Sequence, residues 1–220
     1  GITACESPPK KNSPNSDSST VEFPHKVQAN YAEGFSISYH KNYKLLEILK
    51  PFQDQVDTLR YSLVPRKLVD KVQVKNTEEI PIPIRSLVAT STTHIALTDM
   101  LNANDVVTGM VGADYVYDKE IRKRVEQGEI TSFPMGELNK EKVLTMQPDL
   151  LMISGGQSSQ YDNYRVLMNS GINLLVNSEW LETTPLGKAE WVKVMAALLN
   201  KEKLANRKFS TVAKEYNRLK

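Results

Sequence analysis

The second half of the chain alternates between short apolar runs and stretches with helical spacing, and this alternation limits the possible folds more than any other feature. The runs are at most seven residues long, which suits strands rather than helices, and most are rich in Val, Ile and Leu. Strand–helix alternation of this kind predicts an α/β fold with a parallel sheet covered by helices on both faces. The expected strands are Ser86–Ala89, Asp105–Val111, Asp149–Ile153 and Ile172–Val176, and the expected helices are His94–Asn102, Lys119–Gln127, Asn139–Met146 and Tyr161–Asn169.

A different pattern precedes this region. Apolar residues alternate at Phe35, Ile37 and Tyr39, and further apolar runs follow over 43–49 and 59–63. The turn-prone segment His40-Lys41-Asn42 separates the first two runs. This spacing predicts a β-hairpin or meander, and we assign residues 23–80 to a β-rich N-terminal extension.

The last segment has a strong helix start, with Thr184 as N-cap and Pro185 as the first helical residue. Apolar residues at helical spacing then continue almost to Lys220, which predicts one long helix over 184–220, or two nearly continuous ones. An amphipathic stripe such as Phe209, Val212 and Tyr216 packs against a core. We therefore expect further chain to follow Lys220.

Composition excludes several classes of protein. Of 220 residues, 40% are hydrophobic, and 28 basic against 26 acidic residues give a formal net charge of +2, which predicts no general attraction to nucleic acid. A mean hydropathy of −0.41, with no apolar run near the ~20 residues that a bilayer requires, predicts no membrane-spanning helix. A single cysteine excludes an internal disulfide and multi-cysteine metal sites.

Motifs for catalysis are missing from the sequence. It contains no Gly-x-Ser-x-Gly, no phosphate-binding loop and no His-Glu-x-x-His. We therefore expect a protein that is not an enzyme, with no catalytic residues, no metal site and no cofactor.

The sequence of residues 1–22 predicts a membrane anchor followed by a flexible tether. Residues 6–19 contain no aliphatic or aromatic side chain, so the sequence predicts a disordered segment that reaches about 20 Å. The preceding Ile2-Thr3-Ala4-Cys5 resembles the lipobox at the end of a bacterial lipoprotein signal. This resemblance implies that the thiol of Cys5 is lipidated and anchors residues 1–22 to a membrane.

From Arg85 to Lys220 the chain resembles one lobe of a known family: the periplasmic substrate-binding proteins of ABC importers for iron–siderophore complexes, cobalamin and haem. No single motif carries the resemblance; it rests on the order and spacing of several. These are Arg85–His94 (the first strand and its ligand-facing loop), Val107–Tyr115 (the second), Gly136–Leu144 with Gln147-Pro148-Asp149-Leu150-Leu151 (a short helix and the strand after it) and Gly171–Val176. The segment Tyr31–Phe35 is similar to the N-terminal extension of lipoprotein members of this family from Bacteroidetes-type bacteria.

The resemblance implies an architecture and a function. Residues 81–183 would form the Rossmann-like N-terminal lobe, and residues 184–220 would form the connecting helix, with the second lobe of the family absent. The protein would bind a ferric siderophore, haem or cobalamin and deliver it to the permease subunits of an ABC importer. It would face the periplasm from the bacterial cell envelope, held there by Cys5.

In open α/β sheets the ligand lies beyond the carboxyl ends of the strands, which points to the loops Ser91–His94, Gly112–Tyr117, Gly155–Tyr161 and Asn177–Leu181. Each candidate residue also has a purely structural interpretation. Ser91 and Thr92 suit helix N-caps, His94 suits a buried polar site, and Asp114 suits a turn. The three aromatic candidates suit ordinary partial burial as well as contact with a planar ligand. The candidate ligand-binding residues are Ser91, Thr92, Thr93, His94, Asp114, Tyr115, Tyr117 and Trp180.

In the family, an exposed glutamate on the short helix before the Pro-Asp-Leu strand docks against arginines of the permease, and Glu141 matches that position. A carboxylate there also suits the first turn of any helix. Two other functions remain open. One is a single-lobe surface lipoprotein that binds a protein partner, and the other is a metal-dependent α/β enzyme that uses His94 with Asp114 or Glu179.

Overall fold

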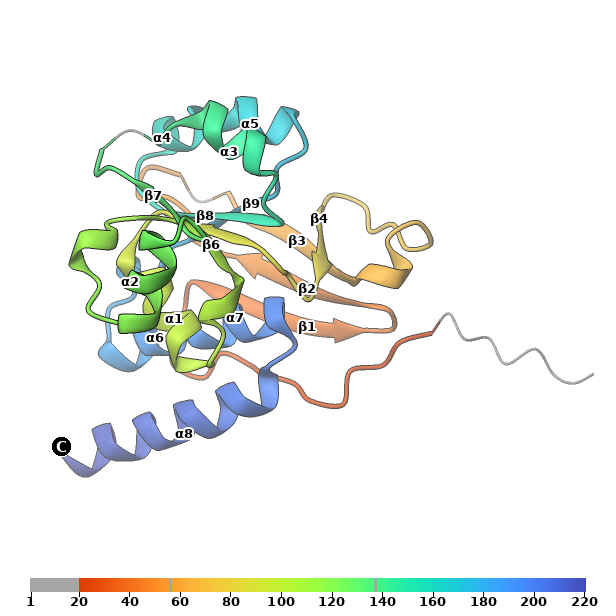
Figure 1. Ribbon diagram of the computed structural model, residues 1–220. Helices are drawn as coiled ribbons and strands as arrows, with labels where there is room; N and C mark the ends of the chain where they lie inside the picture. The colour runs from red at the N-terminus through yellow and green to blue at the C-terminus, as the bar shows by residue number, and fades with distance from the viewer. Residues whose placement is uncertain (1–19, 56, 137) are drawn as a thin grey trace, which may run out of the picture.

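The computed structural model describes residues 20–55, 57–136 and 138–220, and the chain forms two β-sheets that share helices (Figure 1). Cys5 and the tether over 6–19 lie outside the described residues. No helix in the described part has both the length and the apolar character needed to cross a bilayer.

The first sheet has four strands in the order β1-β2-β3-β4: β1 (Phe35–His40), β2 (Tyr43–Ile48), β3 (Leu59–Pro65) and β4 (Glu78–Ile82). The first three are antiparallel, so the predicted meander is confirmed. Strand β4 joins parallel to β3. It was not predicted because polar residues precede and enter it.

The second sheet has five parallel strands: β5 (Leu87–Ala89), β6 (Val107–Val111), β7 (Thr131–Phe133), β8 (Leu150–Ser154) and β9 (Leu174–Asn177). Their order, β7-β6-β5-β8-β9, starts in the middle at β5 and grows outward in both directions, as in a Rossmann-like sheet. The four predicted strands are confirmed with shifted ends. Strand β7 was missed because its three residues carry one large apolar side chain.

Helices cover both faces of this sheet, as predicted. They are α1 (Thr92–Met100), α2 (Lys119–Glu126), α3 (Lys140–Met146), α4 (Ser158–Asp162) and α5 (Arg165–Asn169), with α3, α4 and α5 on one side and α1 and α2 on the other (Figure 1). Polar caps fix the starts of α2 and α3, among others. Asp118 accepts a bond from the backbone N–H of Ile121, and Asn139 from that of Lys142. The helix predicted over 161–169 is instead the pair α4 and α5.

The helical segment after Thr184 is not one continuous helix but three: α6 (Pro185–Ala189), α7 (Val192–Leu199) and α8 (Glu202–Arg218). Thr184 caps α6 as predicted, with its hydroxyl accepting from the N–H of Gly187 at 3.0 Å. Asn200 ends α7 in a left-handed conformation with φ of 56°, which turns the chain before α8.

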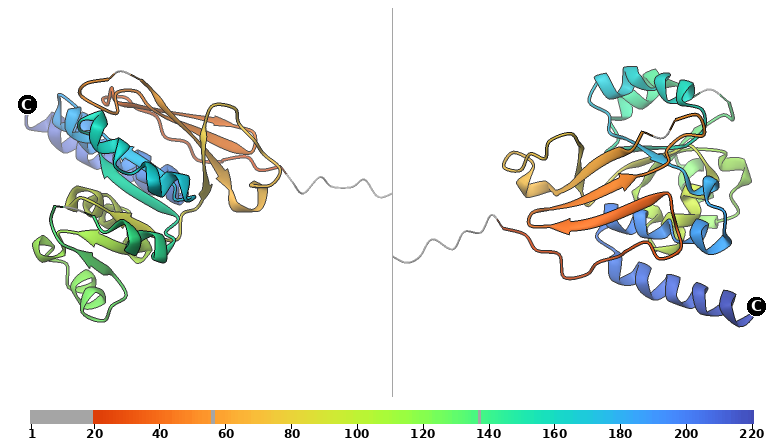
Figure 2. Two further views of the ribbon diagram at one scale, coloured as in Figure 1. Left: turned by 90° about the horizontal axis from the view of Figure 1, so that it is seen from above. Right: turned by 180° about the vertical axis from the view of Figure 1, so that it is seen from behind.

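All eight residues of α7 are buried, and the helix packs against both sheets. Its core includes Ile48 and Leu63 from the first sheet and Leu87 and Met152 from the second. In Figure 2 the blue C-terminal helices lie between the orange strands of the first sheet and the green part of the second. The N-terminal extension and the α/β region therefore share one hydrophobic core, and a smaller cluster fills the opposite face of the parallel sheet beneath α3 and α5.

Two buried carboxylates hold the segment that leads into β1. Glu190 accepts hydrogen bonds from the backbone N–H groups of residues 30–32 and from Nζ of Lys193 at 2.8 Å. Glu182 accepts from the N–H groups of residues 33 and 34 and from the indole N–H of Trp191 at 2.7 Å. Five consecutive backbone donors are thereby satisfied by two side chains from the region around α6.

A buried ion pair joins β2 to α8. Nζ of Lys44 lies 2.7 Å from the carboxylate of Glu202, and it also donates to the carbonyl of Ala197 and the side-chain oxygen of Asn200. The hydroxyl of Tyr39 donates to Glu202 at 3.0 Å. Burial lowers the pKa of Lys44 and the negative charge of Glu202 opposes that shift, with a lowered pKa as the result.

Candidate ligand-binding site

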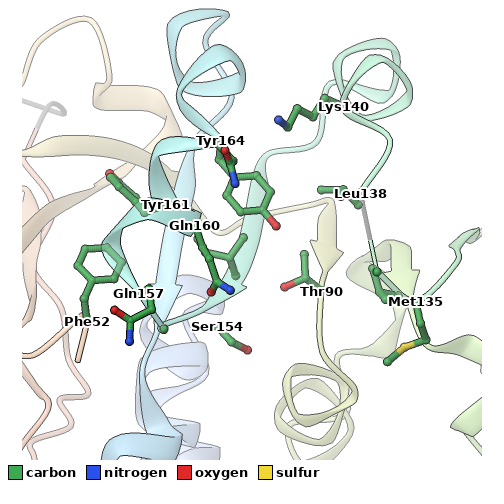
Figure 3. Close-up of a pocket in the computed structure, with 15 residues that line it drawn as sticks. Phe52, Thr90, Met135, Leu138, Lys140, Ser154, Gln157, Gln160, Tyr161 and Tyr164 are labelled. Carbon is green, nitrogen blue, oxygen red and sulfur yellow. The ribbon is translucent and has the colours of Figure 1, made fainter. Parts of the chain in front are cut away.

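A cavity of about 540 Å³ opens at the carboxyl edge of the parallel sheet. Its floor includes Thr90, which follows β5, and Ser154, the last residue of β8 (Figure 3). Strands β5 and β8 are neighbours, and the connections from them lead in opposite directions along the sheet. The cavity therefore lies at the topological switch point, where open α/β sheets bind their ligands.

The floor is fixed by hydrogen bonds between the two strand ends. Both the N–H and the hydroxyl of Thr90 donate to the carbonyl of Met152, at 3.2 and 2.9 Å. Thr90 thus stays at the boundary between β5 and the first turn of α1. A small, rigid polar floor of this kind leaves space for a ligand above the sheet.

Two walls rise from the floor on opposite sides (Figure 3). Gln160, Tyr161 and Tyr164 from α4 and the start of α5 form one wall, and Met135 and Leu138 from the loop before α3 lie across from them. Aromatic surface combined with amide and hydroxyl groups suits a ligand with flat apolar faces and hydrogen-bonding edges. The described lining residues are Phe52, Thr90, Val111, Met135, Gly136, Leu138, Lys140, Ile153, Ser154, Gly156, Gln157, Gln160, Tyr161, Asn163 and Tyr164.

The N-terminal extension also contributes to this cavity, through the segment between β2 and β3. Phe52 packs against Tyr161 with ring centroids 5.2 Å apart. Asp54 accepts hydrogen bonds from the N–H and the hydroxyl of Ser158, at 2.9 and 2.6 Å, and these bonds lower the pKa of its carboxyl group. Residues 52–54 therefore brace the start of α4 from outside the lobe.

Gly155 makes this contact possible because it has no side chain. A Cβ there would collide with the carbonyl oxygen of Pro51 and the hydroxyl of Ser178, which are themselves hydrogen-bonded at 2.9 Å. The indole N–H of Trp180 donates to the carbonyl of Gly155. The chain thus packs backbone to backbone at the rim of the cavity.

The candidates in the first loop lie beside the cavity and do not line it. Ser91 is the N-cap of α1, with its hydroxyl accepting from the N–H of Thr93 at 3.2 Å. Thr92 and Thr93 are exposed in the first turn. The capping interpretation is therefore confirmed for Ser91 and wrong for Thr92, and ligand contact by the three residues stays a prediction.

His94 is fully buried behind this edge. Its Nε2 lies 3.5 Å from the hydroxyl of Ser154, and its Nδ1 has no partner among the residues that the structure describes. Burial lowers the pKa of the imidazole to about 3, so the ring is neutral at physiological pH. This burial favours the structural interpretation of His94. The ring contacts Ser154, which lines the cavity, but does not line the cavity itself.

The remaining candidates do not line the cavity either. Tyr115 and Tyr117 are 68% and 86% exposed on the loop after β6, and Asp114 is exposed beside them. Trp180 is 38% exposed in the 3₁₀ turn η4 (Glu179–Leu181), next to Gly155. Ligand contact by these four side chains stays a prediction.

Sequence reasoning singled out the loop over 155–161, which lines the cavity, but named no ligand-binding residue from it. The signal available was the pair Gly155-Gly156 after an apolar strand, followed by Tyr161 and Tyr164. The wall over 135–140 and the contribution of Phe52 had no comparable signal, because both depend on how distant segments meet.

The metal-enzyme hypothesis required acidic or histidine side chains to converge. Across residues 20–55, 57–136 and 138–220, no group of three His, Cys, Asp or Glu side chains could hold a metal ion. His94, Asp114 and Glu179 thus form no such group.

Comparisons with known proteins agree with this geometry at the level of the fold. No protein-family model matches the chain. An uncharacterized lipoprotein of Methanocaldococcus jannaschii is 32% identical over 147 residues, which are 62% of this chain and 34% of that protein.

Two solved structures of binding proteins are similar in fold. The siderophore-binding protein BauB, bound to ferric iron and two molecules of acinetobactin, matches with a TM-score of 0.50 and 18% identity, over 78% of this chain and 52% of its own. The petrobactin-binding protein YclQ from Bacillus subtilis matches with a TM-score of 0.51 and 15% identity, over 76% of this chain and 50% of its own. The chain spans about half of these structures and about a third of the lipoprotein. It has the fold of a single lobe of the periplasmic siderophore-binding proteins, as the sequence resemblance predicted.

Proposed function

We propose that this chain is part of the substrate-binding component of an ABC importer in the cell envelope, and that the cavity at the switch point holds one side of an iron complex. The observation that carries the proposal is the cavity over β5 and β8, with aromatic side chains on one wall and a polar floor. A ferric siderophore or a haem has flat apolar faces and polar edges, which this lining suits. Cobalamin is a third ligand of the same general kind.

The two similar structures support an iron complex. One is described as a siderophore-binding protein that holds a ferric complex, and the other is described as a petrobactin-binding protein. Neither is described as an enzyme. The ligand class is therefore proposed from the cavity lining together with the shared fold.

Quenching of tryptophan fluorescence tests the proposal. The chain has two tryptophans, Trp180 at the rim of the cavity and Trp191 in the core. We expect a ferric hydroxamate, a ferric catecholate or haem to quench the fluorescence in a saturable way. Comparison with the variant Trp180→Phe then gives the share of the quenching that comes from the tryptophan at the rim.

A pair of variants locates the ligand. Tyr164→Ala removes an aromatic wall and is expected to weaken binding by about tenfold, from the 1–3 kcal/mol that a buried aromatic contact is worth. Tyr216→Ala on α8 is the matched control and should bind as the parent chain does. Equal affinities in the two variants, or no saturable quenching by any iron complex, would count against the proposal.

We also propose that Glu141 docks on the permease. It is exposed in the first turn of α3, and its neighbour Lys140 lines the cavity, so the carboxylate lies on the edge that a transporter must approach to receive the ligand. Glu141→Arg should abolish capture by the cognate permease while leaving ligand quenching unchanged. Glu126→Arg on α2, also exposed, is the control and should leave capture intact.

We propose Cys5 as the site of lipid attachment, supported by the sequence of residues 2–5. Expressed with a lipoprotein signal, the chain should partition into detergent in a Triton X-114 phase separation, and Cys5→Ser should move it to the aqueous phase. Partition of both forms into the aqueous phase would overturn the anchor.

A protein-binding role is the second candidate. Three large apolar side chains, Tyr115, Tyr117 and Met135, are more than two-thirds exposed on the edge that bears the cavity. A protein partner could cover them. If an iron complex binds in a saturable way and Tyr164→Ala weakens that binding, the ligand-binding function is favoured over the protein-binding role.

A further inference from the structure

A second and larger cavity, of about 1010 Å³, lies on the opposite edge of the molecule. Its lining includes Ile82 and Pro83, which precede β5, and the start of α8. Nζ of Lys201, on the same lining, donates to the carbonyls of Leu101 and Asn102, where α1 ends. Since α1 runs away from the carboxyl end of β5, its own end lies at the amino edge of the sheet. We call this cavity the basic groove.

Cations surround the basic groove. Five of its lining residues are basic: Arg66, Lys67, Lys201, Lys203 and Arg207. The chain has a formal net charge of only +2, so this clustering is local. It comes from two separate segments, the 3₁₀ turn η1 (Arg66–Leu68), and the first two turns of α8 with Lys201 just before them.

Most of this charge is not neutralised. Two acidic residues line the groove, and one of them, Glu202, is buried against Lys44 at 2.7 Å. The other is Glu22. Arg66 pairs with Asp149 at 3.1 Å, but Lys67, Lys203 and Arg207 are exposed and form no ion pair within the described part of the chain.

The floor between these cations is apolar. Phe23 and Leu204 are partly exposed there, with Val21 and Pro65 beside them and the buried Ile82 beneath. A small soluble anion such as phosphate would contact the cations and leave this floor in water. A phospholipid with an anionic headgroup has both parts, a phosphate for the cations and a glycerol–acyl shoulder for the apolar floor.

The start of the described chain forms one wall of the groove, over residues 21–25. Cys5 lies sixteen residues before Val21. An acyl chain at Cys5 would hold this edge of the molecule closer to the bilayer than the ligand cavity. The choice of a bilayer as the occupant rests on the proposed anchor, whereas the charge and the apolar floor do not depend on it.

We propose that the basic groove docks on the surface of an anionic bilayer, with Lys67, Lys203 and Arg207 on lipid phosphates and the apolar floor on the glycerol–acyl region. In this orientation the ligand cavity faces away from the membrane that carries the anchor. The groove is therefore a resting contact that the protein leaves when it presents the cavity to a permease.

Vesicle co-sedimentation tests the proposal without the anchor. The whole 220-residue chain carrying Cys5→Ser is mixed with phosphatidylcholine vesicles, either pure or one third phosphatidylglycerol. We expect binding to the phosphatidylglycerol vesicles alone, weakening as salt screens the charges. Absence of binding to the anionic vesicles would overturn the groove contact, and it would leave the iron-complex proposal untouched because that is measured by quenching.

Charge variants identify the surface. Neutralising Lys67, Lys203 and Arg207 together with glutamine should lower the partition coefficient on the order of 100-fold, from about tenfold or less for each basic residue near a membrane. The control neutralises three exposed cations on α2, Lys119, Arg122 and Lys123, and makes the same change in net charge. Equal losses in the two triple variants would show general charge attraction and overturn the proposal.

A fluorescent label tests the apolar floor. An environment-sensitive dye on Leu204→Cys, in the Cys5→Ser background, should shift to the blue when anionic vesicles are added, and the same dye on Lys123→Cys should not. Soluble glycerol phosphate should not displace the protein when supplied at the phosphate concentration of the lipid. An unshifted dye at 204, or displacement by glycerol phosphate, would contradict the apolar part of the contact.

Discussion

A buried histidine and a half-buried glutamate give the stability of this protein opposite dependences on pH. Burial lowers the pKa of His94 to about 3, below its ordinary value of 6.5. Burial also raises the pKa of Glu78 from 4.5 to about 7, opposed by a hydrogen bond from the N–H of Leu174 at 3.2 Å. Both shifts come from loss of water around the charged form.

The signs of the two effects follow from proton counts. Between about pH 3 and 6.5 the unfolded chain binds more protons at His94 than the folded chain does, so stability from this site rises with pH and is lost on acidification. Between about pH 4.5 and 7 the folded chain binds more protons at Glu78, so stability from this site falls as pH rises. Each slope is about 1.4 kcal/mol per pH unit, and in the shared window they oppose each other.

Single variants should reveal the pH dependence of the unfolding free energy that each residue contributes. With Glu78→Gln, the free energy of unfolding should rise by about 2–3 kcal/mol between pH 4.5 and 6.5, because His94 titrates without opposition. With His94→Asn, it should fall by a similar amount over the same interval. Urea unfolding at several pH values measures both. Parallel profiles for the two variants would contradict the burial of one or both groups.

Gly155 is the residue on which the junction between the extension and the cavity depends. Gly155→Ala places a Cβ against backbone and hydroxyl atoms that cannot move aside easily, and it should destabilise the fold by about 1–3 kcal/mol and displace Phe52. Gly156→Ala is the matched control, because its Cβ would meet only the flexible end of Gln160. Thermal unfolding of the two variants separates a local clash from a general effect of adding a methyl group.

At the scale of elements, the buried charges next to α6 and α7 connect the extension to the rest of the fold. Burial raises the pKa of Glu190, but hydrogen bonds from residues 30–32 and from Lys193 outweigh that effect, and the net pKa is lowered. A lowered pKa means that this carboxylate contributes stability above its ordinary value of 4.5 and loses it as the pH falls.

Removing the charge of Glu190 tests this connection. Glu190→Gln leaves Lys193 buried without its ion-pair partner and should cost about 3–5 kcal/mol. The double variant Glu190→Gln/Lys193→Met removes the unpaired charge and should recover part of the loss. Urea unfolding measures both, with Glu126→Gln on the surface of α2 as the control. A loss in the single variant no greater than that of the control would show that the pair is not needed.

The elements of the fold were largely predictable from the sequence, and the exceptions have local causes. Strands β5, β6, β8 and β9 are apolar runs bounded by turns, and their identity follows from hydrophobic pattern. Two nearly continuous helices were one of the predicted forms of the last segment, and the left-handed backbone at Asn200 separates α7 from α8. The further break between α6 and α7 was not predicted. Strand β7 is too short for any pattern to show.

The candidate site was less predictable than the fold. The edge of the sheet that would bind ligand followed from strand order, but the side chains on it depend on loop conformations. Thr90 and Ser154 line the cavity because β5 and β8 end side by side, which no local signal shows. Phe52 comes from more than 100 residues before its partner Tyr161. Sequence patterns describe one segment at a time, and this site is built from five.

At the scale of the whole molecule, the shared core makes one cooperative unit of two sheets. Because α7 packs on both, the first sheet cannot unfold without exposing the face of α7 that it covers. In the Trp180→Phe variant, the fluorescence of Trp191 should therefore change at the same urea concentration as the far-UV circular dichroism. A fluorescence transition at clearly lower urea would mean that the extension unfolds separately.

The two cavities lie at opposite edges of the molecule. The candidate ligand site uses the carboxyl ends of the parallel strands, and the basic groove uses the opposite edge, near the start of the described chain. Occupation of one leaves the other open. A membrane contact on the groove is thus compatible with a ligand already bound in the cavity.

The hydrogen bonds that the backbone of residues 30–34 donates to Glu182 and Glu190 have a consequence for the evolution of this sequence. Both carboxylates bind main-chain N–H groups, which every residue except proline supplies whatever its side chain. In an alignment of relatives, the two glutamates should therefore be retained while the side chains at 30–33 vary, with proline excluded from those positions. Correlated substitution between these partners should be absent, so a contact map inferred from co-variation would overlook a contact that holds the first strand in place.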